Sequence, residues 1–174
     1  MDNRPIGVLD SGMGGLTAVR ELMRVLPNED IVYFGDTGRV PYGTRSPEIV
    51  TRYAIQDINF LLDHNVKMVI AACGTVTTTL PEEVIGRFQF PYTGVLHPTV
   101  RAAATATRNG KIGVIATATT IRTGAYEREL KAMNHDFSVI SKACPMFVPL
   151  VENGYVNRDN QVTRLLAEEY LAPL

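Results

Sequence analysis

The sequence has no excess of charge of either sign, because 17 Lys and Arg residues stand against 18 Asp and Glu residues among 174. This balance excludes a polybasic protein that binds nucleic acid by charge alone. No apolar run approaches the roughly 18 residues that a transmembrane helix needs, so we expect no membrane contact. A hydrophobic fraction of 45% is too high for a disordered chain. The first residues lead straight into a strand-like segment, which predicts no signal peptide.

Cysteine and histidine are scarce as well. Cys73 and Cys144 lie far apart among different neighbours, which excludes a disulfide framework and does not match the spacing of a zinc site. His64, His97 and His135 stand alone, so we expect no metal site. The length suits one domain, or one domain and part of another. Together these features favour a cytoplasmic α/β enzyme.

Short apolar runs alternate along the chain with longer helical patterns. Residues 67–72 form the clearest buried strand, because strands covered on both faces are apolar without interruption. The order strand–helix–strand predicts an α/β fold with parallel sheets flanked by helices. Ligands of such sheets gather at the carboxyl ends of the strands. The predicted strands span residues 6–9, 30–34, 66–72, 92–96, 111–116 and 137–140.

A weak internal repeat suggests two similar halves. Residues 6–10 resemble residues 112–116, although short strand patterns also coincide by chance. We expect two α/β domains, at 1–97 and 98–174. Residues 161–171 predict an amphipathic helix. An α/β chain usually continues into a further strand after such a helix, so we expect the chain to be cut short.

The loop at residues 10–15 follows the first predicted strand and precedes a helix. Its glycines allow close approach of the backbone, and a helix N-terminus favours an anion. The spacing differs from the dinucleotide-binding fingerprint, because no glycine stands at position 17. Asp10 has two interpretations at this stage. It either caps the next helix or directs its carboxylate at a ligand or a catalytic partner.

Cys73 follows the most apolar strand and also has two interpretations. A free cysteine is most often buried, inert packing. At a strand end, near the backbone N–H groups that open a helix, its pKa can instead be lowered, and the thiolate then serves as a base or a nucleophile. No histidine is visibly placed to activate a nucleophilic cysteine, which slightly favours proton abstraction. Thr75 and Thr77 to Thr79 supply hydroxyl groups nearby, for capping or for a ligand.

Other loops carry weaker signals. Residues 36–43 form either a structural turn or the wall of a substrate site. Thr117 to Thr120 follow the first strand of the second half and could face a ligand. Cys144 lies among apolar residues and is interpreted as packing. His97 is interpreted as a helix cap or hinge residue rather than a catalyst.

Five segments of the chain, in the same order, resemble motifs of bacterial glutamate racemases: residues 6–17, 33–43, 72–75, 122–127 and 143–152. The chain is therefore identified as resembling the cofactor-independent aspartate/glutamate racemase superfamily. The resemblance implies two similar α/β domains and a homodimer. It implies interconversion of L- and D-glutamate without pyridoxal phosphate or metal, with two cysteines acting as base and acid. D-Glutamate is a precursor of peptidoglycan, so the resemblance also implies a role in cell-wall synthesis and cell shape.

The resemblance assigns roles to individual residues. Cys73 matches the first catalytic cysteine, and Asp10 matches the carboxylate beside it. The positions that match substrate-binding residues are Ser11, Pro41, Tyr42, Gly43, Gly74, Thr75, Thr117 and Thr120.

The chain departs from the family pattern in three places. Gly74 stands where the family commonly has Asn, and His97 stands where many members have Glu. The Cys-Thr-His motif with the second catalytic cysteine is absent from the 174 residues, and Cys144 belongs to a different motif. We expect little or no racemisation by this chain, and a first domain that lacks its C-terminal segments. Two alternatives stay open: an inactive amino-acid-binding fragment, and a racemase of aspartate or a related acid.

Overall fold

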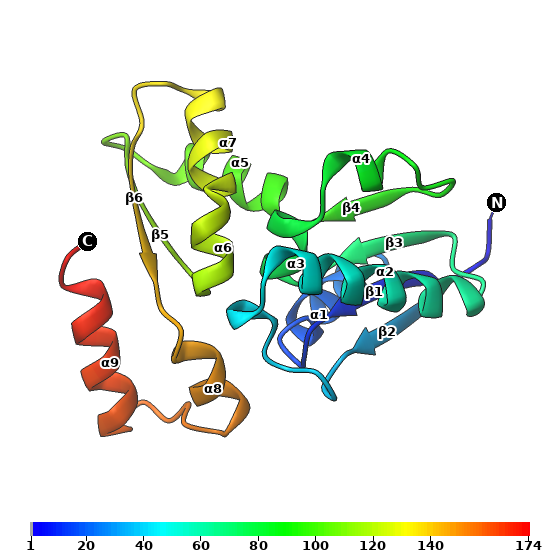
Figure 1. Cartoon of the computed structure of the whole chain (residues 1–174), viewed down its shortest axis with the longest axis horizontal. Helices are drawn as coiled ribbons and strands as arrows, with labels where there is room; N and C mark the ends of the chain where they lie inside the picture. The colour runs from blue at the N-terminus through cyan, green and yellow to red at the C-terminus, as the bar shows by residue number, and fades with distance from the viewer. Residues whose placement is uncertain (1) are drawn as a thin grey trace. The chain divides into compact units, whose positions relative to one another are not determined.

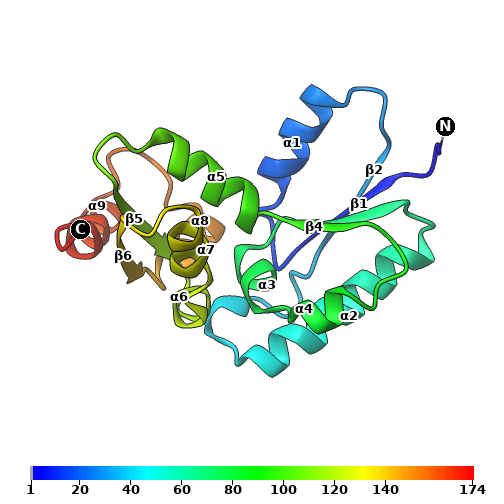
Figure 2. The ribbon, with the colours of Figure 1, turned by 90° about the horizontal axis from the view of Figure 1, so that it is seen from above.

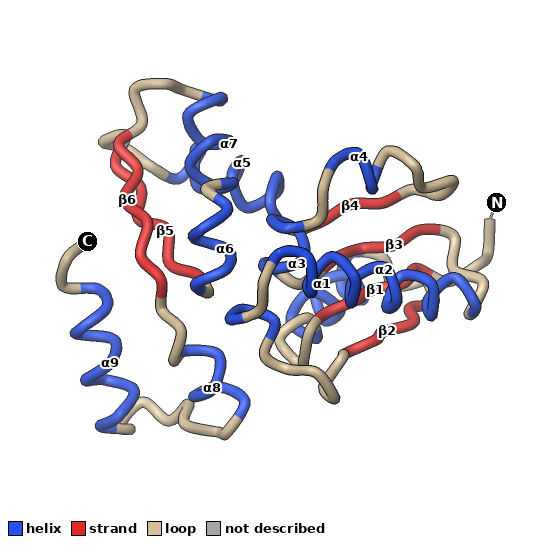
Figure 3. The backbone as a smooth tube through the Cα atoms, in the orientation of Figure 1, coloured by secondary structure: helices blue, strands red, loops and turns tan. Residues whose placement is uncertain are grey.

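The computed structural model describes residues 2–174, which divide into two compact units. The first unit ends at Leu96, and the second runs from His97 to Leu174. Each unit has a parallel sheet of its own, drawn in red in Figure 3. The α/β class with parallel sheets and flanking helices, predicted from the alternating apolar runs, is confirmed.

The first unit contains a four-stranded sheet in the order β2-β1-β3-β4, with every neighbouring pair parallel (Figure 1). All five residues of β1 are buried, as expected for a strand with a neighbour on each side and helices on both faces. The strands are β1 (Ile6–Asp10), β2 (Ile31–Gly35), β3 (Met68–Ala71) and β4 (Tyr92–Gly94).

Helices cover both faces of this sheet. Figure 2 shows α1 and α2 on opposite sides of the strands, as right-handed crossovers require when the chain moves from β1 to β2 and then back to β3. Ser46 caps α2: its hydroxyl accepts a hydrogen bond from the Ile49 N–H group at 3.4 Å, and Pro47 is the first helical residue. The helices are α1 (Leu16–Val25), the 3-10 helix η1 (Tyr42–Thr44), α2 (Pro47–Asp63), α3 (Gly74–Thr79) and α4 (Glu82–Ile85).

The main core lies between α2 and the sheet. The buried apolar residues of α2 recur at helical spacing and pack against Leu9, Val69 and Ala71. By contrast, no residue of α1 is fully buried. The most densely packed part of the unit is therefore the face that carries α2. Its helical core residues are Val50, Ala54, Ile58 and Leu61.

The second unit is built around two parallel strands, β5 (Lys111–Ala116) and β6 (Ser138–Ala143). Gly124, with φ of 64°, separates α6 from α7, and this left-handed conformation suits glycine. The helix predicted at residues 161–171 is confirmed as α9, which Asn160 caps through the Thr163 N–H group. No helix among residues 2–174 is long and apolar enough to cross a membrane. The helices are α5 (Leu96–Ala106), α6 (Ala118–Thr123), α7 (Ala125–Met133), α8 (Phe147–Glu152) and α9 (Gln161–Leu171).

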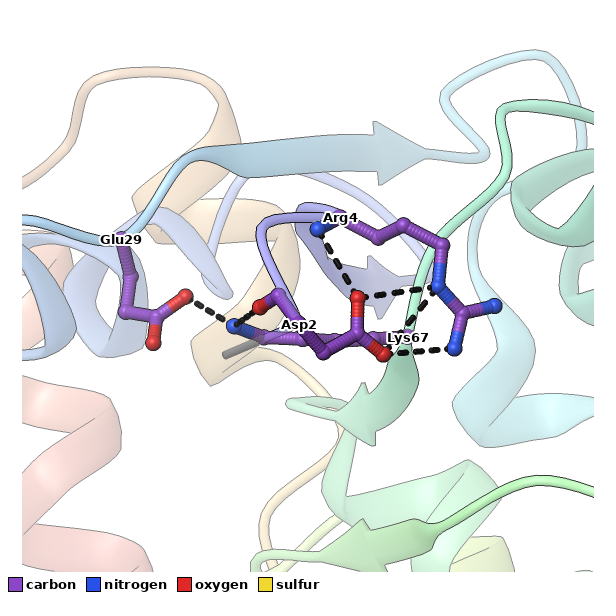
Figure 4. A network of polar contacts seen from close by, with 4 residues as sticks. All are labelled: Asp2, Arg4, Glu29 and Lys67. Atoms are coloured by element: carbon purple, nitrogen blue, oxygen red, sulfur yellow. Dashed lines mark hydrogen bonds and ion pairs between the residues drawn. The ribbon is translucent and has the colours of Figure 1, made fainter.

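A polar network ties the amino end of the first sheet together (Figure 4). Lys67 precedes β3, and its ammonium group pairs with Glu29, which precedes β2, and donates to the Asp2 carbonyl oxygen at 3.0 Å. Asp2 pairs with Arg4 at 2.6 Å, and these hydrogen bonds lower the pKa of the Asp2 carboxyl to about 2. Lys67 thus joins the segments that enter three neighbouring strands.

We expect Lys67→Ala to lower the free energy of unfolding by about 1 kcal/mol, because the Lys67 ammonium group is mostly shielded from water and makes two polar contacts. Lys131→Ala is the matched control. Lys131 pairs with Glu127 within α7, where both side chains are about half exposed, so its loss should cost about 0.5 kcal/mol or less. Urea denaturation measures both, and equal effects would contradict a special role for Lys67.

Candidate active site at the ends of β1 and β3

The centre of the candidate site lies where β1 and β3 end side by side. The two strands pair in parallel, and the Ala72 N–H group donates to the Leu9 carbonyl oxygen at 2.8 Å. The chain leaves β1 toward β2 on one side and returns to β3 on the other, so the strand order reverses here. Such a switch point is the usual ligand site of an open α/β sheet. It brings Ser11 and Cys73 together: the thiol donates to the Ser11 hydroxyl oxygen, with an Sγ–Oγ distance of 3.4 Å.

Asp10 ends β1 and organises the loop that follows it. Its carboxylate is buried, and Oδ2 accepts hydrogen bonds from the N–H groups of Gly12, at 3.2 Å, and Gly15, at 2.9 Å. Gly15 is the N-cap residue that directly precedes α1. Asp10 therefore binds the loop that leads into α1. These bonds also place its negative charge at the same end of the sheet as Cys73.

Two glycines of this region are required by close packing. A Cβ atom on Gly15 would lie 2.7 Å from the Asp10 Cβ atom, and one on Gly35 would lie 2.3 Å from the Gly12 carbonyl oxygen. The same Gly12 oxygen accepts a hydrogen bond from the Tyr33 hydroxyl at 2.7 Å. The loop after β1 is thus fixed by hydrogen bonds to the Asp10 carboxylate and by contacts with Tyr33 and Gly35 of β2. Its backbone leaves no room for larger residues at these positions.

The Cys73 thiol is buried, with only 4% of the residue exposed. Burial raises the pKa of this thiol, and the negative charge of Asp10 raises it further. The Ser11 hydroxyl and the backbone N–H groups of Ser11 and Val76 favour the thiolate, but they do not outweigh burial. The lowered pKa expected from a position before a helix is therefore wrong in direction. A thiol of this kind rests protonated at neutral pH, and its thiolate is a stronger base than an ordinary one.

The residues after Cys73 form the short helix α3. Thr75 is buried, whereas a Cβ atom added to Gly74 would meet no atom within 4 Å. Gly74 is therefore not required by packing, and its lack of a side chain leaves open space next to Cys73. Thr77 and Thr78 turn their hydroxyl groups to backbone carbonyl oxygens of Ala71 and Gly74, so these two are local structural groups.

The segment after β2 corresponds to residues 36–43, which the sequence predicts as a structural turn or the wall of a substrate site. Tyr42 and Gly43 are buried, and Pro41 is partly exposed. The Tyr42 hydroxyl contacts the carboxylates of Asp36 and Asp57. Sequence reasoning missed Asp57, which is 1% exposed in the middle of α2. Its position on the same helical face as Ala54, Ile58 and Leu61 was the available signal, since a carboxylate on a buried face needs partners.

The candidate residues of the second unit follow β5. Thr117 caps α6: its hydroxyl accepts from the Thr120 N–H group at 3.3 Å and donates to the Thr120 hydroxyl at 3.0 Å. Thr120 is buried. Both residues thus have a structural role in the start of α6, at the carboxyl end of the strand.

The remaining candidates, Cys144 and His97, also belong to the second unit. Cys144 is buried and its thiol points to the Lys142 carbonyl oxygen, which fits the interpretation as packing. His97 is exposed and lies 3.5 Å from Glu129. Within residues 2–174, no three His, Cys, Asp or Glu side chains are close enough together to hold a metal ion.

Gly35→Ala should lower the free energy of unfolding by about 2 kcal/mol, because its Cβ atom would overlap the Gly12 carbonyl oxygen and push the loop after β1 away. Gly38→Ala is the matched control three residues later, where a Cβ atom meets nothing within 4 Å, and its effect should stay within about 0.5 kcal/mol. Urea denaturation followed by circular dichroism measures both. Similar values for the two variants would refute the packing described at Gly35.

Comparison with known proteins places the chain among its relatives. No family model matches it. It is 46% identical over 171 residues to a glutamate racemase of Geobacter metallireducens, which covers 98% of this chain and 63% of the relative. The crystal structure of glutamate racemase from Francisella tularensis in complex with D-glutamate superposes with a TM-score of 0.90 at 41% identity, over 99% of this chain and 64% of that one.

A third comparison covers a larger share of its relative. The crystal structure of glutamate racemase from Campylobacter jejuni gives a TM-score of 0.89 at 30% identity, over 98% of this chain and 68% of that one. The chain thus spans about two thirds of the length of the racemases that it matches. By sequence identity and by fold, it belongs to the glutamate racemase family.

Proposed function

We propose that this chain carries the first of the two proton-transfer groups of a glutamate racemase. The observation that carries the proposal is the buried Cys73 thiol at the β1–β3 switch point, hydrogen-bonded to Ser11 and facing the charge of Asp10. Membership of the family gives the reaction: a related racemase was crystallised with D-glutamate. The D-glutamate formed would supply peptidoglycan synthesis.

The chemistry of Cys73 follows from its surroundings. As a thiolate it would take the Cα proton of glutamate: the C–H bond breaks, the S–H bond forms, and the electron pair remains on Cα and spreads into the substrate carboxylate. The Cα proton is very weakly acidic, so its removal needs a strongly basic thiolate. It also needs fixed hydrogen-bond donors that stabilise the developing carbanion in a site without water. The raised pKa of Cys73 supplies the first of these. Backbone N–H groups of the surrounding loops supply the second.

The substrate contacts are proposed from the residues that match the family motifs. Asp10 would orient the thiol and the substrate ammonium group, and Ser11 would bind beside the thiol. The second unit would contribute Thr117 and Thr120. We further propose that residues 1–97 and 98–174 are the two racemase domains, and that the protein acts as a cytoplasmic homodimer, which sedimentation analysis can test. The remaining proposed contacts are Pro41, Tyr42, Gly43, Gly74 and Thr75.

Inversion of Cα needs a second group on the opposite face, because a single base mostly returns the proton to the face it came from. The Cys-Thr-His motif that carries this group in the family is absent from the 174 residues. One base without the other gives exchange of the Cα proton without inversion. The second candidate function is that of an amino-acid-binding chain without turnover.

Incubation with L- and D-glutamate in D₂O tests the proposal. We expect deuterium to enter at Cα of one enantiomer without inversion, as followed by NMR and chiral chromatography. Cys73→Ala should slow this exchange at least about a hundredfold, the usual contribution of a general base. Cys144→Ala is the matched control, since it removes another buried thiol, and should leave exchange unchanged.

Three other outcomes would contradict the proposal. Exchange that persists in Cys73→Ala would assign the base elsewhere. Binding of glutamate without any exchange would favour the binding function. Full racemisation would mean that a second base lies within these residues. Circular dichroism of each variant confirms that it is folded.

At saturating glutamate, where the affinity for the substrate no longer limits the reaction, the rate of exchange should also depend on pH in a defined direction. The base is the thiolate, and its pKa is raised by burial. The rate should therefore keep rising with pH through about 8.5, the ordinary pKa of a thiol, rather than level off below it. A plateau already reached at pH 7 would show that the pKa of the reacting group is lowered instead.

A further inference from the structure

The segment Pro41, Tyr42 and Gly43 contacts a buried cluster of charged side chains through the Tyr42 hydroxyl group. Asp57 and Tyr42 are each 1% exposed, and Asp36 is 5% exposed. Arg39 joins the two carboxylates: its Nε atom lies 2.6 Å from Asp36 Oδ2, and its Nη2 atom lies 2.7 Å from Asp57 Oδ1. The Arg39 guanidinium also stacks over the Tyr53 ring, 4.2 Å from the centroid.

The cluster has more acceptors than donors if both carboxyl groups are ionised. The Tyr42 hydroxyl is within hydrogen-bond distance of Asp36 Oδ2 and of Asp57 Oδ2, the latter at 2.9 Å. A phenol has one proton to donate, and an ionised carboxylate can only accept. One of the two carboxyl groups must therefore carry a proton and donate it to the Tyr42 oxygen. Otherwise two buried oxygens face each other without a hydrogen between them.

The positions of the donors identify Asp57 as the protonated group. Asp36 Oδ2 already accepts from Arg39 Nε and from the Tyr42 hydroxyl, so this carboxylate is ionised. In Asp57 the arginine contacts Oδ1, which leaves Oδ2 to carry the proton toward Tyr42. Burial independently raises the pKa of Asp57 to about 6. The result is a closed ring in which Asp57 donates to Tyr42, Tyr42 to Asp36, and Arg39 to both carboxyl groups.

The elements packed around the ring bring no other charge into it. Of the elements with the most extensive contacts to α2 or η1, α3 and β2 contain no charged residue, and β1 ends in Asp10, whose carboxylate is bound by its own loop. The helix α4 packs against the same core, but its Glu82 and Glu83 are exposed, as are Glu48 and Asp63 of α2. On α2, the Arg52 guanidinium lies 5.5 Å from the centroid of the Tyr53 aromatic ring, and Gln56 accepts a hydrogen bond from Arg39. Arg45 follows η1 and is exposed. The charge of the ring is therefore set by one proton on Asp57.

We propose that Asp57, in its protonated form, and Arg39 are positioning residues that hold Pro41, Tyr42 and Gly43 in the conformation that binds the substrate. The inference rests on the proposed function, which assigns these three residues to glutamate. The hydrogen-bonded ring joins residues 41–43 to the densely packed helix α2 through the Tyr42 side chain. The backbone of these three residues is therefore already ordered when the substrate binds. Loss of the Asp57 proton leaves Tyr42 between two anions with one donor and releases the segment.

The pH dependence has a defined sign. The pKa of Asp57 is raised by folding, so the contribution of this group to the ordered segment is complete at low pH and is lost as the pH rises through about 6. Glutamate binding to the unmodified chain should therefore weaken above that pH, by up to about tenfold per pH unit. Asp57→Asn has a permanent donor and acceptor in the same places. It should bind glutamate with an affinity that does not change between pH 5 and 8.

The experiment uses the full chain and three variants. The Asp carboxyl carbons are labelled with ¹³C and titrated by NMR, which detects the proton on Asp57 directly. Calorimetry measures binding of L- and D-glutamate from pH 5 to 8. Hydrogen exchange of the Tyr42 and Gly43 amides measures the order of the segment without any ligand. The variants are Asp57→Asn, Tyr42→Phe and the control Asp63→Asn, which makes the same chemical change at an exposed position at the end of α2.

The proposal expects the Asp57 carboxyl to titrate near pH 6. Protection of the Tyr42 and Gly43 amides, relative to their intrinsic exchange rates at each pH, should fall above pH 6 in the unmodified chain and in Asp63→Asn, but not in Asp57→Asn. Tyr42→Phe, which breaks the ring at its centre, should accelerate exchange at every pH and weaken glutamate binding about tenfold.

Titration of Asp57 in the ordinary range near pH 4 would overturn the proposal. So would an Asp57→Asn variant with the same pH dependence as the unmodified chain. If no form of the chain binds glutamate, the proposed function fails, while the carbon titration and the amide exchange still decide whether the ring exists. The two failures are therefore distinguishable.

Discussion

The parallel pairing of β1 with β3 determines the candidate site. It brings Ser11 and Cys73, 62 positions apart in the sequence, within hydrogen-bond distance. Two further features of the first unit act on Ser11 and Cys73. The Asp10 carboxylate holds the loop that presents Ser11, and burial of the Cys73 thiol raises its pKa, which makes it a weak acid whose thiolate is a strong base. A change that shifted the register of these two strands would separate the thiol from the loop.

Burial of carboxylates is the second constraint of the first unit. A buried carboxylate is unfavourable unless hydrogen bonds or positive charges compensate for lost water. Asp10 meets this condition with two backbone N–H groups, whereas Asp36 and Asp57 meet it with one arginine and one phenol. In both cases the compensating partners belong to a segment proposed to touch the substrate. The same interactions that make the buried charge tolerable thus fix the shape of the site.

The sequence predicted the parts of the fold that follow from local pattern. The six apolar runs became six strands, and α9 has the predicted bounds. The importance of the strand ends at Asp10 and Cys73 also followed, since strand order alone places them at one edge of the sheet. The direction of the Cys73 pKa could not be predicted, because it depends on how completely the fold buries the thiol. Asp57 was missed because its partners Asp36, Arg39 and Tyr42 come from a loop well separated from it in the chain.

The crystal structure of this chain with bound glutamate tests the central assignment most directly. The account predicts the substrate Cα atom at about 3–3.5 Å from the Cys73 Sγ atom, the range of a near-attack contact, with the backbone of the Tyr42 segment beside the ligand. Glutamate bound with its Cα atom away from Cys73, or at a different end of the sheet, would contradict the assignment of Cys73 as the base.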